Sequence, residues 1–589
     1  MLLSRQCGWG CWHGLLADGN FQAVVAIWAI CLASWMVYLT KYGSPLPWCD
    51  EYLYCVSGIA THDVPISWQF LWQASNEHRQ PLIRLWGVLL GKAFNWDFRP
   101  VRHINAVILG LSGLVMVLAV RKVRGRSELA DAFLPLLALT PFHYATLLVY
   151  SNANCVALAL WCLSASAVLV GWPLQSIPRL LAYVGLLLAV ILGGGVVGSI
   201  WALGFCGVLI AGFFAHQGRA WNYCAGAGLA VVAGSSACML SNIPPPLGGG
   251  IFLSKSLSQT LAMSVKYSDT WMGDVPLATL WPWASLVMVL PGIYLLRRLY
   301  VDLLRHENSE RFAWVLKWFG LLGMAASTVA IAGILGYGRG SYPTPWESRY
   351  CVFAAPIAIA LYFLLVRSSA PALFTGGLAI WMAVCVGWNL PAALSLAQSH
   401  KSCHSVLVKE LRRGHISLSI LAERQPAATG WSAEWGIHNL LGWWCDMRSK
   451  GISAFAKVHG KDQDPATLCV LLPADSGTLD AGLHNEPDAA FRGRCVMAET
   501  VPARAVYAIE VPRGGSYRLC CRWKVTQPGQ MFTVAVDDEL PVGQPVQPQP
   551  GFSACEYGRP LALSAGKHQL AITWPGQGSR MDVLELTPQ

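Results

Sequence analysis

Long runs of apolar residues recur along the first two thirds of the chain, separated by short polar segments. A helix of about 20 apolar residues crosses the hydrocarbon core of a bilayer, and the runs have about this length. A shorter apolar stretch at 81–96 contains Arg84 and Lys92, so we expect it in the membrane interface or as a partial span. The pattern predicts eleven transmembrane helices, at residues 21–39, 103–120, 132–149, 154–171, 180–198, 200–215, 223–240, 277–296, 315–335, 351–366 and 372–390.

The pattern changes after about residue 391, where long apolar runs stop and short segments alternate apolar with polar residues. Glycine-rich turns separate these segments, as they do in antiparallel sheets. We therefore expect a β-sandwich of about 100 residues. The predicted strands lie at 505–511, 516–524, 531–537, 559–563, 568–574 and 581–586, with a further short strand near Val470. The predicted domains are a transmembrane domain at 1–390, a linker with amphipathic helices at 391–465, and the sandwich at 466–589.

Composition and charge support a polytopic α-helical membrane protein. The 589 residues are 54% hydrophobic and only 13% charged, and the 27 tryptophans suit membrane interfaces. The net charge of +10 is not gathered into a basic run with interleaved aromatics, so nucleic-acid binding is not indicated. The apolar run at 21–39 has no small-residue cleavage site after it, which predicts a retained first span rather than a signal peptide.

Basic loops predict the orientation of the chain. Lysines and arginines concentrate at 121–126, at Arg179, at Arg219 and at 297–311, and such loops are cytoplasmic in membrane proteins. Counting spans from them places the N-terminus in the cytoplasm. The same count places the loops 40–102, 241–276 and 336–350, and everything after about residue 391, outside. In a bacterium the protein would lie in the inner membrane, with the sandwich in the periplasm.

The cysteines predict no structural metal site. Many of the 19 lie inside apolar runs, where cysteine behaves as a small hydrophobe, and Cys and His show no zinc-type spacing. The predicted outer region carries an odd number of cysteines, for which we expect no more than one or two disulfides of open connectivity. These cysteines are at positions 403, 445, 469, 495, 520, 521 and 555.

The first outer loop carries the densest group of candidate functional residues. Asp50 and Glu51 follow the first span, and Glu77, His78 and Arg79 come about 25 residues later. Because a carboxylate at the membrane boundary is costly to hold there, such residues are functional candidates. We interpret this stretch as the reactive loop of a membrane enzyme. The alternatives are a solvated loop whose acids face water and, for His78, a structural brace.

A second loop, at 336–350, predicts phosphate binding. Arg339 lies among glycines, and Arg349 and Tyr350 precede the tenth span. A guanidinium binds phosphate oxygens through two parallel hydrogen bonds and keeps its charge at the interface. The alternative is that both arginines reach lipid headgroups, as arginines near span ends commonly do.

These groups together favour one reaction: transfer of a sugar from a lipid phosphate to an acceptor at the outer membrane face. A carboxylate would take the proton of the acceptor hydroxyl as general base. The arginines would stabilise the charge that develops on the leaving phosphate, and a divalent metal ion remains an option beside them. This interpretation requires no cofactor. The expected partners are a lipid-linked sugar donor, a glycan, lipid or protein acceptor, and membrane lipids.

An Asp-Glu pair just after the first span resembles the GT-C superfamily of integral membrane glycosyltransferases. Within it, protein O-mannosyltransferases and lipid A aminoarabinose transferases are the most similar in layout, and the resemblance covers about residues 20–390. It implies that Asp50 is the catalytic base, Glu51 its neighbour, and Arg349 a ligand of the lipid phosphate. It also implies that Glu77, His78 and Arg79 line the same cavity.

The terminal sandwich resembles a carbohydrate-binding module through residues 560–570 and 582–584. Trp523 and Trp574 are candidate sugar platforms, but on alternating strands we expect them in the core. Two other functions remain open for the whole chain. One is a non-enzymatic transporter or flippase for a glycolipid or polysaccharide, with an external sugar-binding domain. The other is a scaffold or sensor that binds polysaccharide.

Overall fold

The computed structural model divides the chain into two compact units, which we describe separately. The first contains Met1–Gly43, Ile66–Leu89 and Arg99–Gln398, and the second contains Ser44–Pro65, Leu90–Phe98 and Ser399–Gln589. The structure describes residues 18–48, 51, 66–73, 79–143, 148, 151–214, 218–243, 253–305, 308–338, 341, 351–413, 417–424, 443–444, 447–448, 450–457, 470–487, 494–511, 513–537, 539–549 and 551–588.

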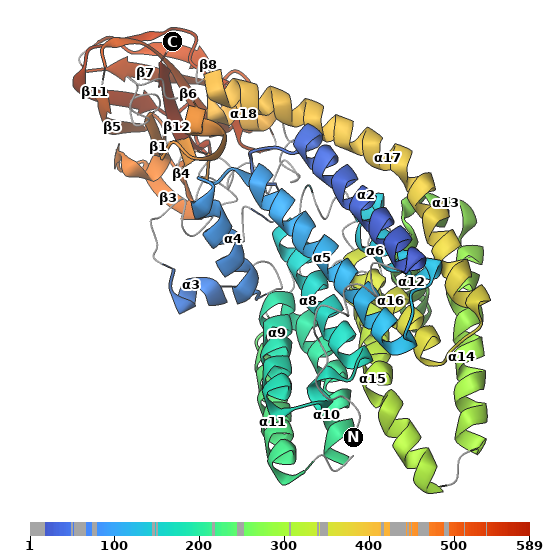
Figure 1. Cartoon of the computed structure of the whole chain (residues 1–589). Coiled ribbons are helices and arrows are strands. Elements are labelled where there is room, and N and C mark those ends of the chain that lie inside the picture. The colour runs from blue at the N-terminus through green and yellow to red at the C-terminus, as the bar shows by residue number, and fades with distance from the viewer. Residues whose placement is uncertain are drawn as a thin grey trace. The chain divides into compact units, whose positions relative to one another are not determined.

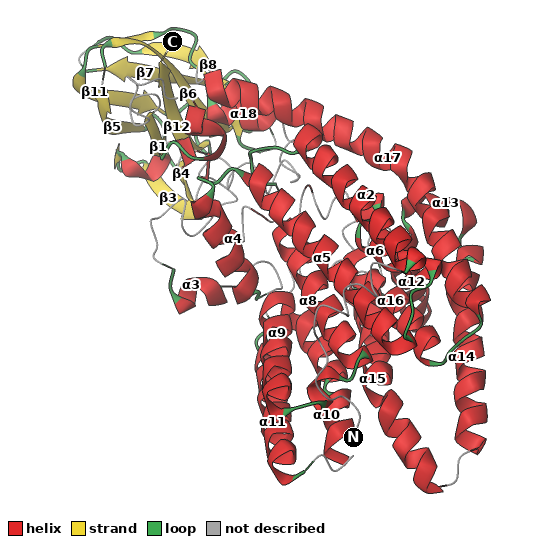
Figure 2. Ribbon diagram, viewed as in Figure 1, coloured by secondary structure: helices red, strands yellow, loops and turns green. Residues whose placement is uncertain are grey.

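The described part of the first unit is helical (Figures 1 and 2). Helix α9 packs against α8, α11 and α15, and α16 packs against α8, α14 and α15. Three of the described helices, α4, α5 and α17, have residues in both units. The α-helices are α2 (Gly19–Tyr42), α3 (Trp68–Trp72), α4 (Pro81–Ala93), α5 (Phe98–Arg124), α6 (Phe133–Ala138), α8 (Ser151–Leu169), α9 (Ile177–Phe205), α10 (Gly207–Phe214), α11 (Arg219–Ser241), α12 (Leu257–Asp269), α13 (Asp274–Leu280), α14 (Leu286–Arg305), α15 (Asn308–Gly338), α16 (Cys351–Arg367) and α17 (Ala372–Arg413).

Among the described residues, seven helical stretches are long and apolar enough to cross a membrane, which is consistent with a membrane protein. One of them, Ile177–Phe214, joins two predicted spans: the chain bends at Gly195, whose φ of 58° suits glycine, and continues as helix. Three predicted spans correspond to the shorter apolar helices Leu129–Ala138, Asn154–Leu169 and Cys351–Arg367. The total of eleven spans stays a prediction.

Acidic partners neutralise basic residues at the end of α5. Asp18 accepts hydrogen bonds from the first turn of α2 and also pairs with Arg121. Arg124 lies 2.8 Å from a carboxylate oxygen of the fully buried Asp131, and the Tyr362 hydroxyl donates to the same oxygen at 2.7 Å. Because a buried carboxylate is stable only when paired, this cluster fixes the chain between α5 and α6.

The described strands all belong to a C-terminal β-domain in the second unit, coloured yellow in Figure 2. One sheet has the order β10-β6-β12-β4-β3, with β1 paired to β12 and β9 paired to β6. The other has the order β2-β5-β11-β7-β8. The strands are β1 (Val470–Pro473), β2 (Thr478–Leu479), β3 (Leu483–Pro487), β4 (Arg494–Ala498), β5 (Arg504–Val511), β6 (Gly515–Lys524), β7 (Met531–Val536), β8 (Val542–Pro545), β9 (Ser553–Glu556), β10 (Leu561–Leu563), β11 (Gly566–Thr573) and β12 (Arg580–Pro588).

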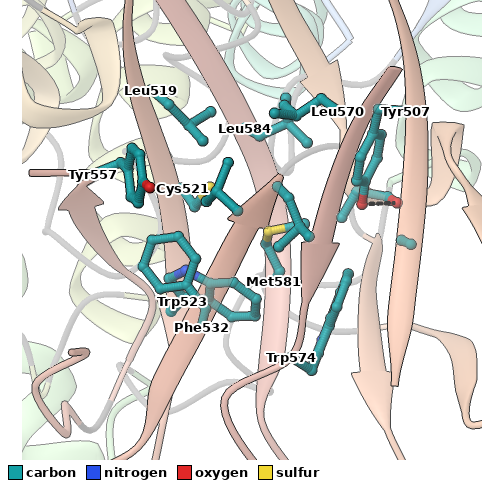
Figure 3. Close-up of a cluster of buried hydrophobic side chains, with 14 of the residues drawn as sticks. Tyr507, Leu519, Cys521, Trp523, Phe532, Tyr557, Leu570, Trp574, Met581 and Leu584 are labelled. Carbon is teal, nitrogen blue, oxygen red and sulfur yellow. Dashed lines mark hydrogen bonds between the residues drawn. The ribbon is translucent and has the colours of Figure 1, made fainter. Parts of the chain in front are cut away.

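Side chains from both sheets form one hydrophobic core (Figure 3). Trp523 and Trp574 are 1% and 3% exposed and meet edge to face with ring centroids 5.3 Å apart, so the prediction that they are core residues is confirmed. The Tyr507 ring is also buried, and its hydroxyl donates to the Ala474 carbonyl at 2.9 Å. Each predicted strand is present, and Val470 begins β1 as expected.

A short helix, α18 (Leu418–Arg424), is attached to the β-domain through Glu585 of β12. The buried carboxylate accepts the Ser417 hydroxyl at 2.5 Å and the backbone N–H groups of Leu418 and Ser419 at 2.8 and 3.2 Å. The two backbone N–H groups are donors that the first turn of a helix leaves without partners. Glu585 therefore caps α18 from a different element of the chain.

Candidate functional site

Six of the eight predicted site residues lie outside the residues that the structure describes. These are Asp50, Glu77, His78, Arg339, Arg349 and Tyr350. The other two, Glu51 and Arg79, are described. Glu51 belongs to the second unit and Arg79 to the first.

Glu51 closes a turn with Trp48. Its carboxylate accepts the Trp48 backbone N–H at 3.0 Å, and its own N–H donates to the Trp48 carbonyl at 2.9 Å. The side chain is only 2% exposed. A buried carboxylate that accepts a backbone N–H holds the local backbone in place, since losing that acceptor would leave the donor without a partner. Glu51 thus shapes the segment that carries the acidic pair.

Two histidines of α17 stack on the indole of Trp48. The ring centroids of His400 and His404 lie 4.2 and 4.6 Å from that of Trp48, and the two imidazoles lie 4.3 Å apart. His404 Nδ1 is 2.8 Å from the Ser44 hydroxyl. Four residues apart on a helix, the two histidines share a face. Sequence reasoning missed this pair, whose spacing was visible but whose partner lies about 350 residues away.

Arg79 connects the ends of two helices. Its guanidinium donates to the Trp72 carbonyl at 2.7 Å, after α3, and to the Asn242 carbonyl at 3.1 Å, after α11. The Arg79 carbonyl lies so near Gly195 that a Cβ there would approach it to 2.9 Å. Two of the five guanidinium N–H groups are used by these carbonyls. These two hydrogen bonds hold the Arg79 guanidinium between the C-terminal ends of α3 and α11.

A buried pair holds the start of α16, directly after the predicted phosphate-binding Arg349 and Tyr350. Cys351 Sγ lies 2.9 Å from His143 Nδ1, and His143 Nε2 lies 3.0 Å from the Leu137 carbonyl. Since a carbonyl only accepts, Nε2 carries the proton and Nδ1 accepts from the thiol. Both side chains are fully buried. The contact anchors the chain where the predicted arginine loop ends.

Asp269, at the end of α12, is a buried acid that the sequence interpretation did not single out. It is 3% exposed and accepts a hydrogen bond from the Ser285 hydroxyl. Burial raises its pKa to about 6. A carboxyl with a pKa near neutrality can exchange a proton under physiological conditions. The rest of α12 is amphipathic, with Leu257, Leu261 and Val265 exposed on one side.

In the β-domain, Asp537, His568 and Ser564 are arranged in the order of a nucleophilic triad. His568 Nδ1 lies 2.9 Å from an Asp537 carboxylate oxygen, and its Nε2 lies 3.3 Å from the Ser564 hydroxyl. However, Nε2 is also 2.9 Å from the Ser564 backbone carbonyl, which only accepts. Nε2 therefore carries a proton and is not a base for the hydroxyl. The arrangement stabilises the turn before β11.

Within the described ranges, no group of three or more His, Cys, Asp or Glu side chains could hold a metal ion.

No known protein family and no curated protein matches the chain. Its C-terminal β-sandwich is similar to carbohydrate-binding modules of known structure. The first is part of a GH26-CBM35 β-(1,4)-mannanase of Podospora anserina, at 17% identity over 21% of this chain and 28% of that chain, with a TM-score of 0.19.

Two isolated modules give similar values. The C-terminal CBM6 of a marine laminarinase from Zobellia galactanivorans matches at 18% identity over 20% of this chain and 98% of that chain, with a TM-score of 0.19. A family 35 carbohydrate binding module from Clostridium thermocellum matches at 16% identity over 20% of this chain and 98% of that chain, also with a TM-score of 0.19. Likeness at this level assigns no binding activity to the chain.

Proposed function

We propose that the protein is a membrane glycosyltransferase. It transfers a sugar from a polyprenyl-phosphate-linked donor to an acceptor at the extracytoplasmic face, with Asp50 as general base. The observation that carries the proposal is the placement of an acidic pair in the segment that follows the first apolar helix, in a chain with several further apolar helices. The GT-C resemblance of this layout supports the same reaction.

The geometry of Glu51 supports different roles for the two acids, Asp50 and Glu51. Glu51 is buried and accepts the Trp48 backbone N–H, so in the proposal it positions the segment. The role of base then falls to Asp50. The Trp48 indole also stacks on His400 and His404, which would keep the segment rigid. A rigid base is effective because its distance to the acceptor hydroxyl is set before the reaction begins.

In the proposed reaction, the Asp50 carboxylate removes the proton of the acceptor hydroxyl. The acceptor oxygen bonds to the anomeric carbon of the sugar, the bond from that carbon to the phosphate oxygen breaks, and the electron pair leaves with the lipid phosphate. Arg339 and Arg349, with Tyr350, would bind this phosphate and stabilise its developing charge. The contact of Cys351 with His143 supports this role for Arg349, because it anchors the chain two residues later.

The test is sugar transfer by the purified protein in liposomes, with radiolabelled polyprenyl-phosphate sugars as donors. Asp50→Asn keeps the shape of the side chain and removes its charge, and we expect it to lower the rate by at least about 100-fold, the usual contribution of a general base. Glu51→Gln is the matched control: its amide oxygen still accepts the Trp48 N–H, so the rate should change less than about tenfold. Equal rates for wild type and Asp50→Asn would remove Asp50 from the mechanism.

The same liposomes distinguish the enzyme from a glycolipid flippase. A flippase would move a fluorescent polyprenyl-phosphate sugar between leaflets without forming a glycosylated acceptor. Translocation without transfer, unaffected by Asp50→Asn, would favour the flippase. Transfer that requires Asp50 would exclude it as the main activity.

A further inference from the structure

Cys521 and Cys555 lie directly opposite each other on neighbouring antiparallel strands of the β-domain. Cys521 belongs to β6 and Cys555 to the short strand β9, and the register pairs the two residues. Two residues along, the Tyr557 N–H donates to the Leu519 carbonyl at 2.8 Å, which makes these pairs hydrogen-bonded ones. Cα atoms in such pairs are about 5.5 Å apart, within the range of about 4.4–6.8 Å that a disulfide spans. The Cβ atoms of a hydrogen-bonded pair are about 5 Å apart, so they have to approach each other to about 4.5 Å as the bond forms.

The two side chains also lie on the same side of their sheet. Cys521 belongs to the core cluster, as its position in Figure 3 shows, and Cys555 packs against that cluster. The neighbouring Cys520 alternates to the opposite face, where its cross-strand partners are Glu585 and Glu556. Only one of the two adjacent cysteines is therefore placed to reach Cys555.

Both residues are thiols in the structure, and they differ in access. Cys521 is fully buried, whereas Cys555 is half-buried and donates a weak hydrogen bond to the Pro545 carbonyl at 3.8 Å. Burial raises the pKa of both thiols. Since the thiolate is the nucleophile in thiol–disulfide exchange, unassisted oxidation will be slow. An external reagent reaches Cys555 first.

We propose that Cys521 and Cys555 form a disulfide bond when the β-domain meets an oxidising disulfide, such as that of a thiol–disulfide oxidoreductase or glutathione disulfide. The Cys555 thiolate attacks the reagent, forms a mixed disulfide and releases one thiol. The Cys521 thiolate then attacks Cys555 Sγ and releases the second thiol. Two protein thiols are oxidised, one reagent disulfide is reduced to two thiols, and both protons go to solvent or to these thiols.

The test uses the purified full-length protein in detergent, incubated with glutathione disulfide. The remaining thiols are alkylated under denaturing conditions, and the digest is analysed by mass spectrometry without reduction. We expect a peptide containing Cys521 joined to one containing Cys555. Cys520→Ser, the matched control, should leave this species unchanged, and Cys521→Ser or Cys555→Ser should abolish it. A bond through Cys520, or alkylation of both Cys521 and Cys555 after oxidation, would overturn the proposal.

A second measurement does not depend on whether the variants fold. Oxidation of the wild-type protein should raise the melting midpoint of the β-domain by roughly 10 °C, because the bond closes a loop that the unfolded chain would otherwise explore. An unchanged midpoint with the bond formed would contradict the native geometry.

The same species in living cells tests the location on which the proposed function rests. Cells are quenched with alkylating reagent before lysis, and the bonded peptides are measured as above. A bond found in cells supports a β-domain on the oxidising side of the membrane. A bond that forms in the purified protein but is absent from cells leaves the disulfide geometry intact and counts against the extracytoplasmic location.

Discussion

The imidazole of His404 lies 4.6 Å from the indole of Trp48, and the planes of the two rings are within 13° of parallel. Trp48 stands two residues before Asp50 in the sequence. His404 is 3% exposed, so the stack is part of the interior of the second unit. In the proposed enzyme this contact holds the segment that carries the base.

We predict that His404→Ala lowers the rate of sugar transfer up to about tenfold, because an aromatic pair contributes about 0.5–1.5 kcal/mol. The KM for the donor should stay constant, since the donor phosphate is assigned to other residues. His404→Phe should restore the rate, because stacking needs only the ring. Ser405→Ala, at an exposed neighbouring position of α17, is the control. A rate that Phe fails to restore would show that stacking alone does not hold the segment, and that the hydrogen bond between His404 Nδ1 and the Ser44 hydroxyl is also required.

Glu585→Ala should destabilise the β-domain by about 2–4 kcal/mol, because the Ser417 hydroxyl and two backbone N–H groups of α18 lose their buried acceptor. Calorimetry of the full-length protein measures the effect as a lower melting midpoint for this domain. Glu556→Ala removes a half-exposed carboxylate paired with Arg518 and should change the stability by less than about 1 kcal/mol. Similar losses in both variants would contradict the capping role of Glu585.

The contact between His568 and Asp537 should make the stability of the β-domain depend on pH. The Asp537 carboxylate raises the pKa of His568, so this stabilisation is complete below about pH 6.5 and is lost as the pH rises through the folded-state pKa. The Gln569 backbone N–H and His568 lower the pKa of Asp537, so its contribution is lost as the pH falls below about 4.

Melting midpoints measured between pH 3 and 9 test this expectation, as differences between wild type and His568→Gln. Because the Asp537 side chain is half-exposed, the wild-type advantage should be about 1–5 °C and should be largest between pH 4 and 6.5. A difference that grows above pH 8 would show the opposite linkage and exclude the ion pair as its source.

Asp269 should have the opposite effect on the first unit near neutral pH. Its pKa is raised by burial to about 6, so the folded state favours the neutral acid, and stability falls as the pH rises from about 4 through 6. Asp269→Asn stays neutral and should gain about 2–3 kcal/mol over wild type at pH 7.5 relative to pH 4. Ser285→Ala removes a hydrogen bond that lowers this pKa, so it should move the wild-type transition to higher pH. Thermal inactivation in detergent across this range measures both.

The long helices and most of the longer strands were predictable from the pattern of apolar residues. A helix surrounded by lipid or protein is apolar all round, and a strand with one buried face alternates apolar with polar residues. In β5, buried residues alternate with exposed or half-buried ones, and the strand was found from that alternation. The strands β2, β3, β4, β8 and β9 were missed, because each has five residues or fewer and shows too little alternation. The prediction divided this apolar run after residue 198, whereas the structure bends at Gly195, because hydropathy gives the length of an apolar run and not the backbone angles within it.

The candidate site was predictable only in its local part. Asp50 and Glu51 stand out because carboxylates are rare in this chain, and position alone made them candidates. The contacts of Trp48 with His404 and of Cys351 with His143 join residues more than 200 positions apart. No period or motif in one sequence encodes such pairs, because they depend on how the helices pack.

The cap that Glu585 places on α18 also determines where the chain can be cut. A recombinant fragment that begins at Val470 would contain the sheets and lack Ser417, Leu418 and Ser419, which fill the buried surroundings of this carboxylate. Such a fragment would expose a face of β12 that is covered in the intact chain. A soluble form of the domain for crystallisation or glycan screening should therefore begin before Ser417, so that it contains both α18 and the β-domain.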